Sequence, residues 1–223
     1  MPTVTLLAIE DAEIRESAPD TNFGTATTII VQSQTKNMRA LIKFNISTLL
    51  GKSIQGAELR CIASYSNPMD NYHRDHLIRR TTGIWSETGV TWNNKPVVSD
   101  LNSNVSHHDY LGGTETEIYP VAAMLQDAVN EGKTELGLMI QDNVEYATSL
   151  NYLEYYAKER GSPPQLVVTY TEAPPPTHTI SINSSPVTGV PVNLDASSIG
   201  NTPVAQSVLE GTHTVSVPSE VQT

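Results

Sequence analysis

The densest group of side chains able to do chemistry is the stretch YHRDH at residues 72–76. Imidazole and carboxylate groups can ligate a transition metal or hydrogen-bond the hydroxyls of a ligand. In an extended strand, a spacing of three places His73 and His76 on opposite faces, so that only a helix or a tight loop would bring them together. Because a proline-containing turn signal precedes the stretch, we expect a solvated loop at the rim of a binding surface. Tyr72, His73 and Asp75 are its candidate ligand-binding residues.

Four of the nine tyrosines lie in a second polar stretch, residues 143–156. A tyrosine presents an apolar ring and a hydroxyl, which suits sugars and protein partners. We therefore take Tyr146, Tyr152 and Glu154 as further candidate ligand-binding residues. The alternative is that these tyrosines fill a core that contains only two phenylalanines, and alternation along a strand would separate Tyr146 from Tyr155.

Two tryptophans, Trp85 and Trp92, stand seven residues apart in a turn-rich stretch. Their rings can stack on the C–H face of a pyranose. Alternatively, both tryptophans pin a long loop onto the rest of the protein while Glu87 accepts hydrogen bonds from backbone N–H groups. The turn-rich setting favours the second interpretation.

Oxygen-bearing side chains near the N-terminus suggest a structural calcium ion. Asp11, Asp20 and Asn22 supply the carboxylate and amide oxygens that a hard cation prefers. The alternative is ordinary turn chemistry, in which Asp and Asn bond their own backbone. The stretch 107–109 (HHD) is a weaker candidate for a metal, in what we expect to be a Ser/Asn-rich loop. No other cofactor is required by the sequence.

The sequence contains no motif of an enzyme active site. A glycosidase needs two facing carboxylates, but acidic residues are abundant here and no pair stands out. Motifs for a serine nucleophile or a phosphate-binding loop are absent. The single cysteine, Cys61, alternates with apolar neighbours as in a buried strand and excludes an internal disulfide. We therefore expect a protein that is not an enzyme.

Charge and hydropathy exclude two further classes of partner. The 223 residues carry 13 basic and 24 acidic side chains, a net charge of −11. This acidic balance argues against a nucleic-acid groove, which needs clustered Lys and Arg. No apolar run reaches the roughly 20 residues of a membrane-spanning helix, so we expect no membrane insertion.

The elements that must position these residues are mainly short strands. Composition favours strands because Thr, Ser, Asn and Val are plentiful and charged residues make up only 17% of the chain. Alternating or β-branched patterns predict strands over residues 27–32, 39–44, 53–62, 136–140 and 166–170. One segment, residues 121–130, has apolar residues at helical spacing, with Pro120 tolerated in its first turn and Gly132 as a stop. We expect this helix to close one end of a β-sandwich.

The composition changes along the chain and indicates two units. Residues 172–178 contain three consecutive prolines, which favour an extended spacer. We expect a first unit over residues 1–171, a Pro-rich linker over 172–178 and a small β unit over 179–223. All 13 aromatic residues and every Lys and Arg precede the linker. We therefore expect a thin core in the tail, and a fold that is incomplete in this chain.

The first unit resembles the DNRLRE-type β-sandwich domain, a family grouped with carbohydrate-binding modules. Five stretches in the family's order carry the resemblance: 11–24, 39–47, 54–59, 85–96 and 158–170. Asn45 stands where the family usually has Asp, and Lys158 where it usually has Arg, which puts a bidentate contact in doubt. The resemblance implies glycan binding or surface display without catalysis.

The tail resembles a PEGA-like module, a small β-rich repeat of surface proteins. The stretches 185–192, 200–203 and 209–215 carry this shorter resemblance. The pattern normally continues through a further strand with an aromatic residue, so we expect a partial module.

Together these observations predict an all-β protein: an antiparallel, jelly-roll-like β-sandwich with one short helix, followed by a small β module. We expect a surface-displayed protein that binds glycan or polysaccharide for adhesion or attachment. The alternative is a structural subunit of a virion, sheath or extracellular filament that self-assembles through its β modules. The N-terminal residues lack the pattern of a signal peptide, and we expect an extracellular, cell-surface or virion-surface location.

Overall fold

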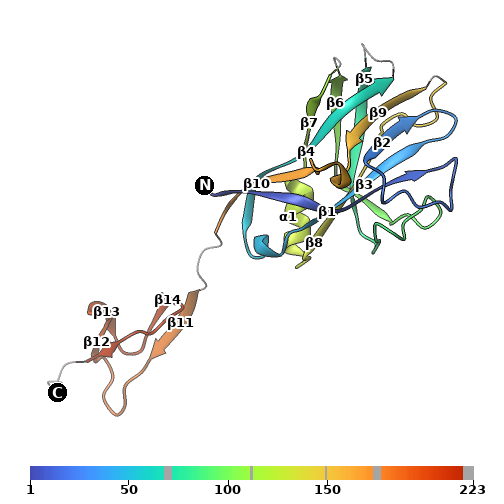
Figure 1. Cartoon of the computed structure of the whole chain (residues 1–223). Helices are drawn as coiled ribbons and strands as arrows, with labels where there is room; N and C mark the ends of the chain where they lie inside the picture. Colours follow the sequence, from blue (N-terminus) through green and yellow to red (C-terminus); the bar gives the residue numbers. More distant parts are fainter. Residues whose placement is uncertain (68–71, 111–112, 149, 173–176, 218–223) are drawn as a thin grey trace. The chain divides into compact units, whose positions relative to one another are not determined.

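The computed structural model describes residues 1–67, 72–110, 113–148, 150–172 and 177–217, without the side chains of residues 65–67, 72, 73 and 110. The chain forms two compact units, Met1–Glu172 and Ala173–Thr223 (Figure 1). Strands dominate both units, and one short helix, α1 (Ala122–Asn130), lies in the first. The predicted all-β, sandwich-like fold with one short helix is therefore confirmed.

The described residues of the first unit form ten strands. They are β1 (Thr3–Arg15), β2 (Thr28–Ser33), β3 (Met38–Asn45), β4 (Ser53–Asn67), β5 (Tyr72–Thr81), β6 (Val98–Tyr110), β7 (Glu115–Pro120), β8 (Glu135–Asp142), β9 (Asn151–Tyr156) and β10 (Gln165–Thr171). They pair in the order β1-β10-β4-β9-β2-β3-β8-β5-β6, with β7 added beside β4. Two short 3-10 turns, η1 (Ser47–Leu49) and η2 (Lys158–Arg160), complete the unit.

The sheet closes on itself because long strands change partners along their length. The first half of β1 pairs with β10 through Thr3–Leu7, and its second half pairs with β3 through Ala8–Arg15. β4 in turn pairs with β10, β7 and β9. The result is a two-layered sandwich with β3, β8, β5 and β6 in one layer, and the main core lies between the layers.

The strand β3 shows why one layer is buried on both faces. Ala40, Ile42 and Phe44 point into the main core. Leu41, on the opposite face, packs in a second cluster with Trp85. The segment 82–97, which we call the tryptophan loop, therefore covers the outer face of this layer.

The helix α1 closes one end of the sandwich (Figure 1), as the apolar spacing predicts. Its buried residues are Met124, Leu125, Ala128 and Val129, and Gly132 just beyond it has the left-handed φ of 69°. The predicted position of Pro120 is wrong. Pro120 ends β7 opposite Glu58 and lies outside the helix, because the β4 ladder extends up to it.

Two further sequence predictions are wrong. Residues 72–76 and 107–109 were expected in loops, but they lie in β5 and β6, which pair in register from Tyr72↔Tyr110 to Ile78↔Asn104. Tertiary pairing overrides the polar composition of both segments, and it is this composition that predicts a loop from the sequence.

Cys61 is fully buried, as predicted, and burial raises the pKa of its thiol.

Residues 177–217, the described part of the second unit, form five short strands: β11 (Thr177–Ile182), β12 (Pro191–Leu194), β13 (Ser197–Asn201), β14 (Val204–Leu209) and β15 (Val215–Ser216). β11 pairs with β14, while β12 lies between β13 and β15. Asp195 and Ala196 join β12 to β13 with φ values of 49° and 65°, as a type I′ hairpin turn requires. β11 begins at Thr177, inside the segment expected to be linker.

Only three hydrophobic side chains are buried among the described residues of this unit: Val190, Val192 and Leu194. The thin core expected from an aromatic-free tail is therefore what the structure shows. A core of this size contributes little stability on its own.

Candidate functional site

The starts of β5 and β9, the strands that carry most of the predicted ligand-binding residues, lie at the end of the sandwich away from α1 (Figure 1). Asn67 at the end of β4 lies opposite Tyr152 at the start of β9. His76, near the start of β5, lies opposite Asp142 at the end of β8. We call this end the loop rim. It carries the starts of β5 and β9 and the described residues 143–148 and 150 between β8 and β9.

Asp75 forms an exposed polar group on the rim with two residues of β6. His107 Nδ1 lies 2.7 Å from Asp75 Oδ1, and its Nε2 lies 3.0 Å from Asp109 Oδ1. These two carboxylates raise the pKa of His107, Asp75 through its hydrogen bond most of all. Because both ring nitrogens already face carboxylates, the group presents a charged hydrogen-bonding surface rather than an open metal site.

Tyr146 is the most exposed tyrosine among the described residues, with 60% of its surface accessible. Its φ of 61° is left-handed, which is unusual for a bulky residue. The Tyr146 N–H donates to Asn37 Oδ1 at 3.2 Å, and the next amide donates to Ser33 Oγ at 3.2 Å. The Arg39 guanidinium holds Glu145 with two hydrogen bonds of 2.8 and 2.9 Å. The neighbouring structure thus holds this tyrosine in a strained backbone conformation.

The strand β9 separates its tyrosines by alternation, as expected. Tyr152 and Glu154 lie partly exposed on the outward face, while Leu153 and Tyr155 are buried. Glu154 accepts a hydrogen bond of 3.1 Å from Ser64 Oγ. The interpretation that tyrosines fill the core is therefore confirmed for Tyr155, and ligand binding by the outward-facing Tyr152 and Glu154 stays a prediction.

Two of the predicted residues, Tyr72 and His73, have described backbones in β5, but their side chains lie outside the described part of the structure. The alternation of β5 sends His76 inward, away from the rim, where it is fully buried. The spacing of three in one strand predicts that His73 faces away from His76, and that prediction falls outside the described side chains.

The inward-facing His76 belongs to a buried polar network that sequence reasoning missed. Its Nδ1 lies 2.9 Å from Tyr119 Oη and 3.0 Å from Tyr155 Oη, and the two phenols are hydrogen-bonded to each other. The neighbouring His108 bonds Glu117. Desolvation, followed by the nearby His108 and Arg74, lowers the pKa of His76 well below its usual value. The only sequence signal was a polar residue at an inward position of β5, and it required the strand register to be read.

The three residues proposed to bind calcium lie in different settings. Asp11 is 1% exposed. Asn22 Nδ2 donates to the carbonyls of Glu87 and Val90 at 2.7 Å, which fastens the tryptophan loop. Asp20 accepts a hydrogen bond from Asn93 at 2.8 Å. These contacts of Asn22 and Asp20 fit the alternative interpretation, in which Asp and Asn stabilise the backbone and the loops.

The carboxylates near Asp11 belong to Glu87 and Glu159, with ligand atoms all within 4.8 Å of one another. Desolvation raises the pKa of Asp11 to about 7, while the Lys158 N–H at 2.8 Å favours its charged form. The Lys158 ammonium bonds both Glu87, at 2.9 Å, and Glu159. A bound cation would compete with this ammonium. Calcium binding remains a prediction, and this group is where it would be tested.

Trp85 anchors the tryptophan loop and is only 6% exposed, packed with Leu41, Val90 and Met139. Trp92 is partly buried, with Arg39 and Lys95 against its ring. Glu87 Oε1 accepts a hydrogen bond of 3.2 Å from the Asp11 N–H. The interpretation that the tryptophans pin the loop, and that Glu87 binds backbone N–H, is therefore confirmed.

Comparison with known proteins identifies the sandwich unit. No curated protein matches the chain significantly. No helix among the described residues is long and apolar enough to cross a membrane. Residues 2–170 match carbohydrate-binding module family 96. This span covers the helix and all ten strands of the sandwich. Only the last residue of β10 lies outside it. The chain therefore belongs to carbohydrate-binding module family 96.

Proposed function

We propose that this protein is a non-catalytic, surface-displayed module that attaches to a glycan or polysaccharide through the loop rim. Membership of a carbohydrate-binding module family supports carbohydrate binding, and such families are in general non-catalytic. Adhesion through the rim, and display outside a cell or on a virion, are proposals that go beyond the family match.

The observation that carries the rim assignment is Tyr146. An exposed aromatic ring in a left-handed backbone conformation is costly, and strain of this kind is concentrated at functional sites. Glu154, Tyr152 and the Asp75–His107–Asp109 group add hydrogen-bonding side chains at the same end of the sandwich. An exposed ring beside carboxylates and imidazole is a surface that can stack on a sugar and bind its hydroxyls.

A glycine substitution separates a binding role from a structural one. Tyr146→Gly removes the ring and accommodates the positive φ, so we expect the free energy of unfolding to rise by about 1 kcal/mol. Glycan binding, measured by polysaccharide pull-down and glycan array, is expected to fall at the same time.

Tyr156→Ala is the matched control. Tyr156 lies on the same outward face of β9 as Tyr152 and Glu154, at the other end of the strand, where its ring packs against Arg160. Removing Tyr156 is expected to leave binding unchanged. Glycan binding that is equal in wild type and Tyr146→Gly, or silence of the wild type across acidic and neutral polysaccharides, would contradict the proposal.

The second candidate function is a structural subunit that self-assembles, as in a virion, sheath or filament. The observation in its favour is the tail, in which the described β11 pairs with β14 alone and leaves its other edge open to a further strand. Size-exclusion chromatography with light scattering distinguishes the two candidates. A stable monomer that binds sugar supports attachment, whereas an obligate assembly without a glycan ligand supports the structural role.

A further inference from the structure

The tryptophan loop borders a groove at the α1 end of the sandwich, away from the loop rim. Two cavities of about 270 and 280 Å³ both use Ile84 and Trp85 as walls, so they adjoin. The first lies among the end of β5, the start of the loop and the segment 131–137 between α1 and β8. The second lies over residues 86–94 of the loop.

Fixed charged side chains form the floor of the first cavity. Arg80, whose side chain is 8% exposed, makes a two-pronged ion pair with Glu131, with Nη1 2.9 Å from Oε2. The Lys43 ammonium, also nearly buried, lies 2.6 Å from Glu10 and donates to the Trp85 carbonyl at 2.7 Å. Each buried cation is thus held in place by its own carboxylate.

Charges paired in this way suit hydroxyls better than a free ion. A carboxylate beside a guanidinium or ammonium offers an acceptor and a donor side by side, which is what neighbouring sugar hydroxyls require. An incoming anion would have to compete with Glu131 and Glu10 for the same cations. The thin layer of threonine hydroxyls around the cavity, at positions 81, 82 and 134, adds further neutral partners.

Trp85 provides an unused hydrogen-bond donor next to this cavity. Its Nε1 is buried and has no hydrogen-bond partner among the described residues. The atom lies 3.2 Å from where a Cβ on Gly137 would stand, and Gly137 lines the same cavity. A buried donor without a partner is costly. Because Thr81 Oγ1 fills the space beside Gly137 and the indole nitrogen has almost no accessible surface, a ligand oxygen reaches this donor when the Thr81 side chain turns aside, and the hydrogen bond then recovers that cost.

Ile84 supplies the apolar part of the groove. It is fully exposed, an unusual setting for a large aliphatic side chain, and it stands in the wall shared by the two cavities. An apolar side chain between the charged first cavity and the more apolar second cavity can pack against the C–H face of a sugar while hydroxyls reach into the first cavity.

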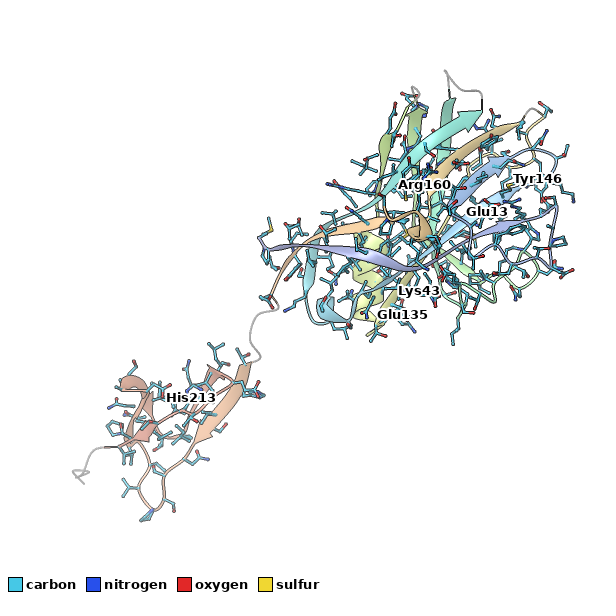
Figure 2. All side chains as sticks on the ribbon, viewed as in Figure 1. Glu13, Lys43, Glu135, Tyr146, Arg160 and His213 are labelled. Atoms are coloured by element: carbon cyan, nitrogen blue, oxygen red, sulfur yellow. The ribbon has the colours of Figure 1, made fainter. Side chains whose placement is uncertain are left out.

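We propose that this groove is a second carbohydrate-binding site, which takes two consecutive residues of a neutral glycan. The proposal rests on the proposed glycan-binding function and adds a separate site to it. Figure 2 shows Lys43 and Glu135, which line the groove, well apart from Tyr146 on the loop rim. Two distant sites on one sandwich allow the protein to bind two glycan chains, or two stretches of one chain, with the gain in avidity that bivalency gives.

The indole N–H signals of the two tryptophans give a direct readout. In ¹H–¹⁵N spectra of the full chain, the probes are neutral hexasaccharides of glucose, mannose, galactose and xylose, each at millimolar concentration. We expect at least one probe to shift the Trp85 indole signal, with the Trp92 indole as internal reference. Trp92→Phe assigns the two signals.

The variants test whether the shift reports binding in the groove. Ile84→Ala is expected to raise the dissociation constant measured at the Trp85 signal about tenfold, because it removes most of the apolar contact. Leu101→Ala, an exposed apolar residue on β6 outside the groove lining, is the matched control and is expected to change nothing. Tyr146→Gly is expected to leave the Trp85 titration unchanged.

Three outcomes overturn the second site. They are a Trp85 indole that no hexasaccharide moves, a shift that Ile84→Ala leaves at wild-type affinity, and a shift produced by inorganic phosphate but by no sugar. Failure of the rim gives a different result. Signals of residues around Tyr146 would then stay still while Trp85 responds.

Discussion

At the scale of single residues, the chemistry of this protein depends on which face of a strand each side chain occupies. Asp75 and His76 are adjacent in sequence, yet one joins the exposed group around His107 and the other the buried network around Tyr119 and Tyr155. Residue type alone made both plausible ligands. The register of β5 against β6 and β8 decides their roles.

The buried His76 makes the sandwich sensitive to acid. Its pKa is lowered in the folded state, so between its folded value and about 6.5 the unfolded chain binds a proton that the folded chain does not. The contribution of His76 to stability therefore falls as pH falls below 6.5, by up to about 1.4 kcal/mol per pH unit, while Asp11, whose pKa is raised to about 7, acts in the opposite sense. His76→Asn keeps a polar atom near the phenols and removes this titration. Urea unfolding between pH 5 and 7 should show a smaller pH slope in the variant, and equal slopes would contradict the assignment.

Gly137 allows the close approach that the groove wall requires. A Cβ at this position would lie 2.1 Å from Thr81 Oγ1 and 3.2 Å from Trp85 Nε1. We expect Gly137→Ala to lower the free energy of unfolding by about 1–3 kcal/mol through overpacking. Because the closer clash is with Thr81, the double variant with Thr81→Ala should recover a large part of that loss. Chemical denaturation of the two single variants and the double variant measures this. If their changes in the free energy of unfolding simply add, the clash is relieved elsewhere.

The calcium prediction can be tested at Asp11. Calcium at the carboxylates of Asp11, Glu87 and Glu159 would raise the melting temperature, since a ligand that binds only the folded state stabilises it. Millimolar calcium is expected to raise the melting temperature relative to a chelator, and Asp11→Asn to abolish the difference. Asp20→Asn distinguishes the group of Asp11, Glu87 and Glu159 from the group predicted from the sequence, which also contains Asp20 and Asn22. Only the second group includes Asp20. An unchanged melting temperature with and without chelator would dismiss calcium.

At the scale of elements, the tryptophan loop acts as a third layer on the sandwich. Trp85 and Val90 pack on the outer face of β3 and β8, and Asn22 fastens the loop backbone from the other side. The sequence indicated a pinned loop through its tryptophans and Glu87. It gave no sign that the loop, β5 and the segment after α1 would enclose a groove, because these segments meet only in the fold.

The amide of Asn22 should control how firmly the tryptophan loop is held. Asn22→Ala deletes both hydrogen bonds to the carbonyls of Glu87 and Val90, and we expect a loss of about 2 kcal/mol. Amide hydrogen exchange should quicken within residues 82–97 more than in β4. Asn93→Ala, which removes an exposed contact with Asp20, is the control and should cost under about 0.5 kcal/mol. Equal exchange in wild type and Asn22→Ala would place the anchor elsewhere.

At the scale of the whole molecule, the chain combines a well-packed sandwich with a tail that has little core. The sandwich contains nearly all of the buried hydrophobic side chains of the described residues, whereas the tail buries Val190, Val192 and Leu194. His213 adds polar contacts to the tail, with Nδ1 2.6 Å from Asp195 Oδ2 and Nε2 2.7 Å from the Leu209 carbonyl. Such exposed contacts add little stability.

We expect the two units to unfold separately. Residues 1–172 alone should keep the melting temperature that the sandwich has in the full chain, because every described residue of its two hydrophobic clusters lies within this unit. Residues 173–223 alone should show marginal stability. Calorimetry of the full chain and of both parts measures this. A single cooperative transition of the full chain, lost when the tail is removed, would contradict it.

The amino-acid sequence by itself determined the features that depend on local pattern. Alternation and β-branched composition predicted the strands β2, β3, β8 and β10, apolar spacing predicted α1, and the aromatic-free tail predicted a thin core. The order of five short stretches also led to a carbohydrate-binding-module resemblance, and the family match agrees with it at that coarser level. Each of these signals acts through neighbours in sequence, so it needs no knowledge of the rest of the chain.

Only the tertiary structure decided which polar residues meet. It turned the expected loops at 72–76 and 107–109 into paired strands and buried His76 with two phenols. It also separated Asp11 from Asp20 and assembled the groove around Ile84 from three distant segments. The physical reason is that strand pairing and register bring together residues far apart in sequence. A shift of one residue in register exchanges the buried and exposed faces of a strand, and polar composition alone does not specify that register.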